Sequence, residues 1–186
     1  MTSYLIVAAA KTETAYVPDG FEVVLTGIGK TAAAVTTARA LAGRDDLADL
    51  TVVNLGTAGA LRDGIEGLFE IGEVINHDLN AEAIRALGYD PRERLQVGNG
   101  ETVLASGDLF VNDPADRARL AQHAHLVDME GYAVAWAALS FGVPIRMVKH
   151  VSDNADESAM SWPEKVDASA RVLGDWITAN LVPGSA

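Results

Sequence analysis

Two carboxylates stand in apolar surroundings in the stretch VDMEGYAVAWAA, residues 127–138. Asp128 and Glu130 flank Met129, and the small and aromatic residues that follow directly indicate a buried helix. A carboxylate is costly to bury unless hydroxyls, cations or backbone N–H groups satisfy it. The pair therefore indicates either a solvated turn or a partly buried site that binds a polar ligand.

Other residues with chemical potential follow apolar runs elsewhere in the chain. Asp153, in VSDNAD, is placed to be either the N-cap of a helix or a general acid in a pocket. Glu13, in AAAKTETAY, taken alone resembles an exposed helix residue, and only its position after the first apolar run hints at a role. The stretches TGIGKTAAA and NLGTAGAL each place glycines where backbone N–H groups can face an oxyanion or a sugar hydroxyl, or where the chain merely turns tightly.

The elements that must position these residues alternate between strands and helices. Short β-branched runs predict buried strands, and Ala-rich or amphipathic segments between them predict helices. This alternation predicts an α/β fold, a three-layer α/β/α arrangement with a mainly parallel mixed central sheet. The predicted strands are 4–10, 21–27, 50–56, 72–78, 101–107 and 144–152, and the predicted helices are 30–43, 113–124, 130–142 and 162–181.

Polar and glycine-rich residues gather where these predicted strands end. In parallel sheets the carboxyl ends of the strands form the ligand-binding edge. Six such clusters at equivalent positions predict one pocket built from the whole chain. The clusters are Glu13, GIGK (27–30), GTAG (56–59), SGD (106–108), DME (128–130) and SDNAD (152–156).

Composition excludes several classes of protein. The 186 residues suit one domain, 1–186, and the formal net charge of −12 argues against nucleic-acid or anionic membrane surfaces as partners. The absence of cysteine excludes disulfides and thiolate sites, and the four histidines show no metal-binding spacing, so we expect no cofactor. No apolar run is long enough to span a bilayer, and the N-terminal run reads as a strand, which favours a cytoplasmic protein.

Taken in order, the clusters resemble the purine nucleoside phosphorylase and nucleosidase superfamily, and most closely its methylthioadenosine/S-adenosylhomocysteine nucleosidases. The resemblance implies cleavage of the N-glycosidic bond of a purine nucleoside by a nucleoside phosphorylase-like fold. It extends over most of the chain, through LIVAAAKTET, TGIGKTAAA, NLGTAGAL, ASGDLFV, VDMEGYAVAWAA and GVPIRMVKHVSDNAD.

The resemblance also implies roles for individual residues. Asp153 would protonate the leaving purine at N7, and Glu13 would activate the attacking water. Glu130 would hold the ribose 2′- and 3′-hydroxyls, with Met129 against the sugar and Asp128 in a supporting position. The further substrate-binding residues would be Phe110 stacking on the base, the Val111 and Ser152 backbones at its edge, Thr57 and Gly59, and Trp162 on the 5′ side.

The nucleophile is the main alternative. The related phosphorylases carry an arginine just before the glycine turn of the third strand, where this chain has Asn54 and Leu55, and this absence favours water over phosphate. Phosphorolysis and a non-catalytic nucleoside-binding module are the alternatives. Futalosine hydrolases resemble the same pattern but tend to carry Asn where Asp153 stands. The family implies a homodimer, although the short link between Tyr16 and Phe21 lacks the hairpin that relatives insert there.

Overall fold

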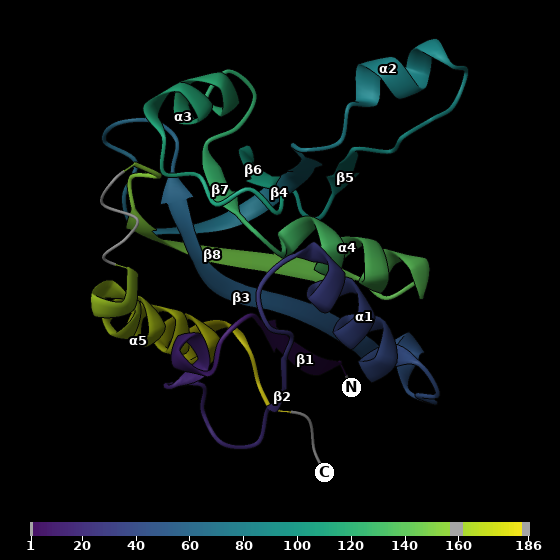
Figure 1. Ribbon diagram of the computed structural model, residues 1–186. Coiled ribbons are helices and arrows are strands. Elements are labelled where there is room, and N and C mark those ends of the chain that lie inside the picture. The colour runs from purple at the N-terminus through teal and green to yellow at the C-terminus, as the bar shows by residue number, and fades with distance from the viewer. Residues whose placement is uncertain (1, 157–161, 184–186) are drawn as a thin grey trace.

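The computed structural model describes residues 2–156 and 162–183 (Figure 1). Within them the chain forms eight strands, five α-helices and two short 3₁₀ helices. The strands are β1 (Ser3–Ala8), β2 (Glu22–Leu25), β3 (Leu50–Ala60), β4 (Leu68–Asn76), β5 (Arg94–Gln96), β6 (Thr102–Ser106), β7 (Leu126–Asp128) and β8 (Ile145–Asp153). The helices are η1 (Lys11–Thr14), α1 (Lys30–Leu41), η2 (Leu47–Asp49), α2 (Ala81–Ala86), α3 (Pro114–Leu120), α4 (Gly131–Ser140) and α5 (Trp162–Asn180).

The strands of the described chain join in one mixed sheet, in the order β2-β1-β3-β7-β6-β4-β5. Strand β8 lies off this path and pairs in parallel with β3 and antiparallel with β4. The pairs β1–β2, β1–β3, β4–β6 and β6–β7 are parallel, whereas β3–β7 and β4–β5 are antiparallel. The prediction of a mainly parallel mixed sheet is therefore confirmed.

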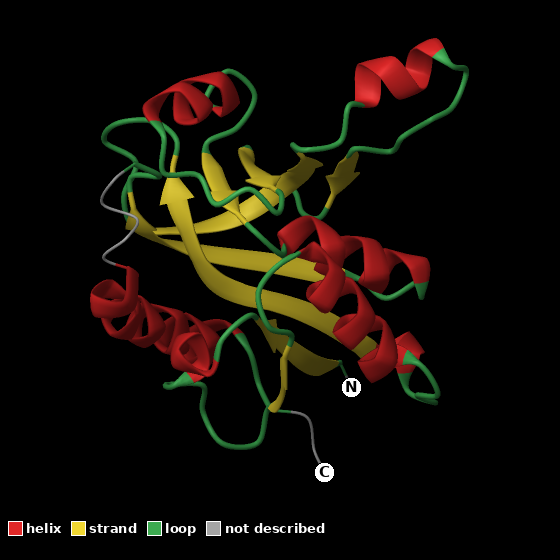
Figure 2. Ribbon diagram, in the orientation of Figure 1, coloured by secondary structure: helices red, strands yellow, loops and turns green. Residues whose placement is uncertain are grey.

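Helices cover both faces of this sheet (Figure 2). Helices α1 and α4 bury small side chains such as Ala33 and Ala135 against Leu5, Val52 and Leu104 of the strands. On the other face, α5 buries Leu173 and Ile177 in a separate cluster with strand residues of β1, β3 and β8. Because apolar side chains leave both faces of the central strands, those strands read in the sequence as continuous apolar runs.

The predicted strands and helices all have counterparts, but the sequence missed β5, β7 and α2. Each of these is six residues or shorter, too short to show a periodic pattern. The GTAG stretch was wrongly placed after the third strand. Strand β3 runs through it to Ala60, because its pairing with β8 continues as far as Gly59.

Local signals set several element ends as expected. The Asp113 carboxylate accepts hydrogen bonds from the N–H groups of Ala115 and Asp116, and Pro114 occupies the first turn of α3. Gly142 follows α4 in a left-handed conformation, with φ of 72°. Among the described residues, no helix is both long and apolar enough to cross a membrane.

Candidate active site

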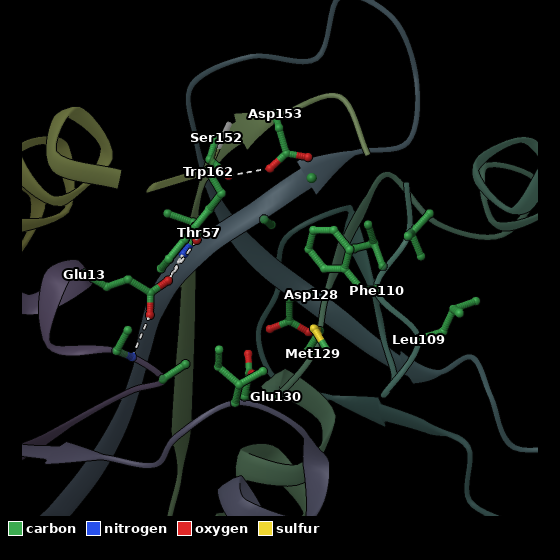
Figure 3. A pocket seen from close by; sticks show the side chains of 17 residues that line it. Glu13, Thr57, Leu109, Phe110, Asp128, Met129, Glu130, Ser152, Asp153 and Trp162 are labelled. Carbon is green, nitrogen blue, oxygen red and sulfur yellow. Dashed lines mark hydrogen bonds between the residues drawn. The ribbon is translucent and has the colours of Figure 1, made fainter. Parts of the chain in front are cut away.

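A cavity of about 530 Å³ opens where η1, β3, β7, β8 and the start of α5 meet (Figure 3). The residues that the sequence singled out come from widely separated segments, and the structure brings all of them to this cavity. Its described lining includes Glu13, Thr57, Gly59, Phe110, Val111, Asp128, Met129, Glu130, Ser152, Asp153 and Trp162.

Glu13 is buried on η1 and is held by three donors of the protein. Its Oε1 accepts hydrogen bonds from the Thr57 backbone N–H and the Thr57 hydroxyl, each at 2.8 Å. Its Oε2 accepts one from the Ala10 N–H at 3.1 Å. A Cβ at Gly56 would lie 3.1 Å from Glu13 Oε1, so a glycine there gives the carboxylate room to approach β3. The orientation of Glu13 is thus fixed from both oxygens.

Glu130 lies in the short link between β7 and α4 and has a different environment. Its Oε1 accepts a hydrogen bond from the Gly29 N–H at 2.7 Å, in the glycine turn before α1. Burial, followed by the nearby negative charge of Asp128, raises the pKa of Glu130 to about 7. A carboxyl with so few protein partners is well suited to accept hydrogen bonds from ligand hydroxyls.

Asp128 forms a buried ion pair with Lys149, a residue that the sequence analysis missed. The Lys149 Nζ lies 2.8 Å from Asp128 Oδ2, and both side chains are almost fully enclosed. Burial acts to lower the pKa of Lys149, but the adjacent Asp128 outweighs it and the pKa is raised. The backbone N–H of Gly131 also donates to Asp128. The sequence did contain a signal for this ion pair, because Lys149 lies within the apolar strand run PIRMVKHVS. A buried lysine is rarely unpaired, so its position indicates an acidic partner.

Asp153 is the last residue of β8, just after an irregularity in the pairing of β8 with β3. Such bulges re-aim side chains and are common beside active sites. The carboxylate accepts hydrogen bonds from the Ser152 hydroxyl at 2.7 Å and from the Ala155 N–H at 2.8 Å. A Cβ at Gly59 would lie 2.9 Å from Asp153 Oδ1, so a side chain there would collide with the carboxylate.

One part of the cavity wall is apolar and accessible. Phe110 is 47% exposed, and Leu109 and Ile28 beside the cavity are also exposed, whereas Val111 is buried. An exposed aromatic ring at a cavity offers a stacking surface for a planar ligand. Met129 completes the lining between the two carboxylates of the β7–α4 link (Figure 3).

The hydroxyl of Thr57 has partners within the protein. It donates to Glu13 and accepts a hydrogen bond from the indole Nε1 of Trp162 at 2.8 Å. Both side chains line the cavity, where the sequence predicted substrate contacts, and the structure also joins them to each other by this hydrogen bond.

The charges around the cavity are strongly one-sided. Among the described lining residues the ionisable groups are Glu13, Asp128, Glu130 and Asp153, and none is basic. The N–H groups that open α1 are also occupied by carboxylates, since Gly29 donates to Glu130 and Lys30 donates to Asp108 at 2.7 Å. The site can accept protons and hold hydroxyl groups, but it would repel a dianion.

Comparison with known proteins relates the chain to a family. A family model described as the phosphorylase superfamily matches residues 70–177. The chain is 30% identical over 147 residues to an aminodeoxyfutalosine nucleosidase of Helicobacter pylori strain J99, covering 66% of this chain and 64% of that protein. It is also 30% identical over 192 residues to a 5′-methylthioadenosine/S-adenosylhomocysteine nucleosidase of Glaesserella parasuis serovar 5, covering 83% and 77%.

Solved structures share the fold. A crystal structure of the H. pylori 5′-methylthioadenosine/S-adenosylhomocysteine nucleosidase matches with a TM-score of 0.79 at 24% identity, covering 96% of this chain and 97% of that one. The H. pylori futalosine hydrolase matches with a TM-score of 0.78 at 23% identity, covering 96% of each chain. The matched regions span 64% and 43% of the length of the aminodeoxyfutalosine nucleosidases of H. pylori strains J99 and 26695, less than two thirds in each case.

Proposed function

We infer that this chain, which belongs to the phosphorylase superfamily, hydrolyses the N-glycosidic bond of a purine nucleoside. The observation that carries the proposal is the set of carboxylates around one cavity, without a basic residue in its described lining. Glycosidic cleavage passes through an oxocarbenium-like transition state, with positive charge on the sugar and negative charge on the departing base. Ionised carboxylates that face the first charge, and a protonated carboxyl that gives its proton to the second, suit that reaction.

The leaving base is assigned to Asp153 and Phe110. The purine stacks on the exposed ring of Phe110, and Asp153 gives its proton to N7 while the bond between C1′ and N9 breaks. The Ser152 hydroxyl and the Ala155 N–H hold the Asp153 carboxyl in one orientation for this transfer. General acid catalysis of this kind is worth about 10²- to 10⁴-fold in rate.

The sugar is assigned to Glu130 and the attacking water to Glu13. Ionised Glu130 accepts hydrogen bonds from the 2′- and 3′-hydroxyls and stabilises the positive charge that develops on the ribose. Glu13 removes a proton from water as the water oxygen bonds to C1′. The three donors that hold Glu13 fix its position for this step. The products are the free base and the free sugar.

Water is favoured over phosphate as the nucleophile by the charges of the site. Phosphate dianions are usually held by arginine forks or by free N–H groups at a helix start. Here the helix-start N–H groups of Gly29 and Lys30 already donate to carboxylates. The buried cation Lys149 is paired with Asp128. Phosphorolysis would require a dianion to enter a cavity whose described lining has four acidic side chains and no basic one.

The substrate is proposed to be an adenosine-like nucleoside with a modified 5′ position. Methylthioadenosine or S-adenosylhomocysteine is supported by the relative from G. parasuis. An aminodeoxyfutalosine-type substrate is a second candidate, supported by the relatives from H. pylori. Both candidates present a purine and a ribose to the same residues and differ at the 5′ substituent.

A chromatographic assay tests the proposal. Purified protein is incubated in phosphate-free buffer with adenosine, inosine, methylthioadenosine, S-adenosylhomocysteine and aminodeoxyfutalosine, and uridine serves as the pyrimidine control. We expect free purine base from at least one purine nucleoside and no uracil. Turnover that appears only after phosphate is added would instead support a phosphorylase.

We also propose that the protein is a cytoplasmic homodimer. Figure 1 shows α2 held away from the other helices, and the residues that follow it, Leu87 and Tyr89, are 75% and 71% exposed. Exposed apolar groups of this kind mark interaction surfaces. In analytical ultracentrifugation we expect a dimer that a Leu87→Ser/Tyr89→Ser double variant weakens. The control Val182→Ser, which removes an equally exposed apolar side chain, should leave it intact. Cell fractionation tests the proposed cytoplasmic location, and we expect the protein in the cytoplasmic fraction.

A further inference from the structure

A chain of two hydrogen bonds connects the start of α5 to Glu13. The indole Nε1 of Trp162 donates to the Thr57 hydroxyl, and that hydroxyl donates to Glu13 Oε1, each at 2.8 Å (Figure 3). The three residues come from α5, β3 and η1, and they are brought together only by the fold. Trp162 therefore lines the cavity and is also linked to Glu13 through Thr57.

The direction of this chain is set by the chemistry of its donors. An indole N–H can only donate, and a threonine hydroxyl has one hydrogen. Because Thr57 accepts from Trp162, its single hydrogen remains for Glu13. Hydrogen bonds in series also polarise one another, which strengthens the bond to the carboxylate. Without the indole N–H, the hydroxyl could rotate and donate to water in the cavity instead.

Further contacts fix α5 against the segment that carries Glu13. The Tyr16 hydroxyl, just after η1, donates to Asp167 Oδ1 of α5 at 2.9 Å. The guanidinium of Arg171 lies 4.3 Å from the centroid of the Tyr16 ring. These contacts fix the position of α5 relative to η1. The indole of Trp162, at the start of α5, is therefore held close to Thr57.

We propose that Trp162 is a positioning residue for the attack of water, acting through Thr57 to hold the Glu13 carboxylate. The inference rests on the proposed function in one respect, the assignment of Glu13 as the group that activates water. It gives Trp162 a role different from that of a wall for the 5′ substituent. A wall would affect the binding of 5′-modified substrates, whereas a positioning residue affects the turnover of every substrate.

The kinetic test uses Trp162→Phe, which keeps an aromatic ring and removes the N–H. We expect kcat to fall about threefold to tenfold, the typical effect of one net hydrogen bond, with KM changed by less than about twofold. The loss should be equal for adenosine and for a 5′-modified substrate. A rise in KM confined to the 5′-modified substrate would overturn the proposal and make Trp162 a substrate contact.

Double variants test whether the effect passes through Thr57. In a Thr57→Val background, Trp162→Phe should cause no further loss of kcat, and in a Thr57→Ser background it should again lower kcat. Additive losses in the Val background would overturn the proposal. Trp176→Phe is the matched control, because Trp176 is also on α5 and donates its indole N–H to Glu70, outside the cavity lining. It should leave kcat unchanged.

A spectroscopic test does not depend on activity. The chain has three tryptophans, so a ¹H–¹⁵N correlation spectrum contains three indole signals, and Trp162→Phe identifies one of them. We expect Glu13→Gln to shift that signal, and to shift it no longer when Thr57 is replaced by Val. If no nucleoside is hydrolysed, the proposed function fails while this shift still supports the hydrogen-bond chain. If Glu13→Gln leaves the Trp162 indole signal unshifted, the proposed hydrogen-bond chain is overturned.

Discussion

Glu13 and Glu130 line the same cavity, and their carboxylates meet different partners. Glu13 accepts three hydrogen bonds from Ala10 and Thr57, which engage both of its oxygens. Among the described residues the hydrogen bond to Glu130 comes from Gly29 alone, and Asp128 lies nearby with the same charge. The protein itself thus orients the carboxylate of Glu13, whereas the carboxylate of Glu130 can accept further hydrogen bonds from a ligand.

This difference matches the two tasks proposed for them. A group that removes a proton from water must hold one position, because small displacements of a catalytic group are costly in rate. A group that holds a sugar gains most if the sugar hydroxyls supply the missing donors. The comparison predicts that changes at Glu13 act on turnover alone, whereas changes at Glu130 act on binding as well as on turnover.

The largest effect on kcat is expected for Asp153→Asn. This variant shows how the kinetics change when the chemical step is impaired and binding is not, which is the standard for comparing Glu13 with Glu130. We expect kcat to fall by about 10²- to 10⁴-fold, because the departing purine no longer receives a proton. Binding of the free base, measured by calorimetry, should change little. Turnover close to that of the wild type would remove Asp153 as the acid and would favour a different leaving-group partner.

The next effect concerns the ion pair beside Glu130. Lys149→Met leaves Asp128 buried without its cation, and we expect a loss of about 3–5 kcal/mol in the free energy of unfolding. Adding Asp128→Asn should recover much of this loss. Arg119→Met, which breaks an exposed ion pair with Asp116, is the control and should cost less than about 1 kcal/mol. Urea denaturation measures all three, and equal costs for Lys149 and Arg119 would contradict the account.

Exchanging each carboxylate for an amide compares the two residues directly. Glu13→Gln should lower kcat by about 10²-fold with KM nearly unchanged. Glu130→Gln should raise KM by about 10- to 100-fold, because it weakens charge-assisted hydrogen bonds to two hydroxyls. It should also lower kcat, because the positive charge that develops on the ribose loses a stabilising anion. Steady-state kinetics on the same substrate measures both. The reverse pattern, with KM altered at Glu13 and only kcat at Glu130, would break the comparison.

A smaller effect is that the ionisation of Glu130 makes the free energy of unfolding depend on pH. Its pKa of about 7 exceeds the ordinary value of 4.5, owing to burial and to Asp128, with Glu13 and Lys149 also facing it. Between these values the folded state keeps the proton and the unfolded state has lost it, so stability falls as pH rises. The wild type should lose up to about 3 kcal/mol over this range relative to Glu130→Gln. A variant with the same slope as the wild type would remove Glu130 as the cause.

The same ionisation should act on binding in the opposite direction. Ligand hydroxyls donate to the ionised form of Glu130, so nucleoside affinity should rise as pH rises through about 7. Calorimetric titration of Asp153→Asn with an intact nucleoside measures this, because the variant cleaves the nucleoside slowly.

Much of the fold could be predicted from the sequence because its strands are apolar and its helices have clear ends. The continuous runs around Val7, Val53 and Val148 mark strands covered on both faces. The Asp113–Pro114 pair marks the start of α3. Strand β7, of three residues, has no such signal, and yet it carries Asp128.

The residues that line the cavity could be predicted from the sequence, but the hydrogen bonds among them could not, because they join distant segments. Glu13 lies 44 residues from Thr57, and Trp162 lies 105 residues from Thr57. Residue order carries no local pattern for such contacts. Lys149 is the exception, since a charged residue within an apolar strand signals a buried partner, although the sequence does not show which one.

Product analysis in the presence of phosphate tests the central claim most directly. The wild type and Glu13→Gln are each incubated with the best nucleoside substrate and excess phosphate, and the sugar product is identified by mass spectrometry. We expect free sugar from the wild type, unaffected by phosphate, and a rate lowered by about 10²-fold in Glu13→Gln. A sugar 1-phosphate as the main product, or free sugar formed equally fast by the variant, would contradict hydrolysis by water activated at Glu13.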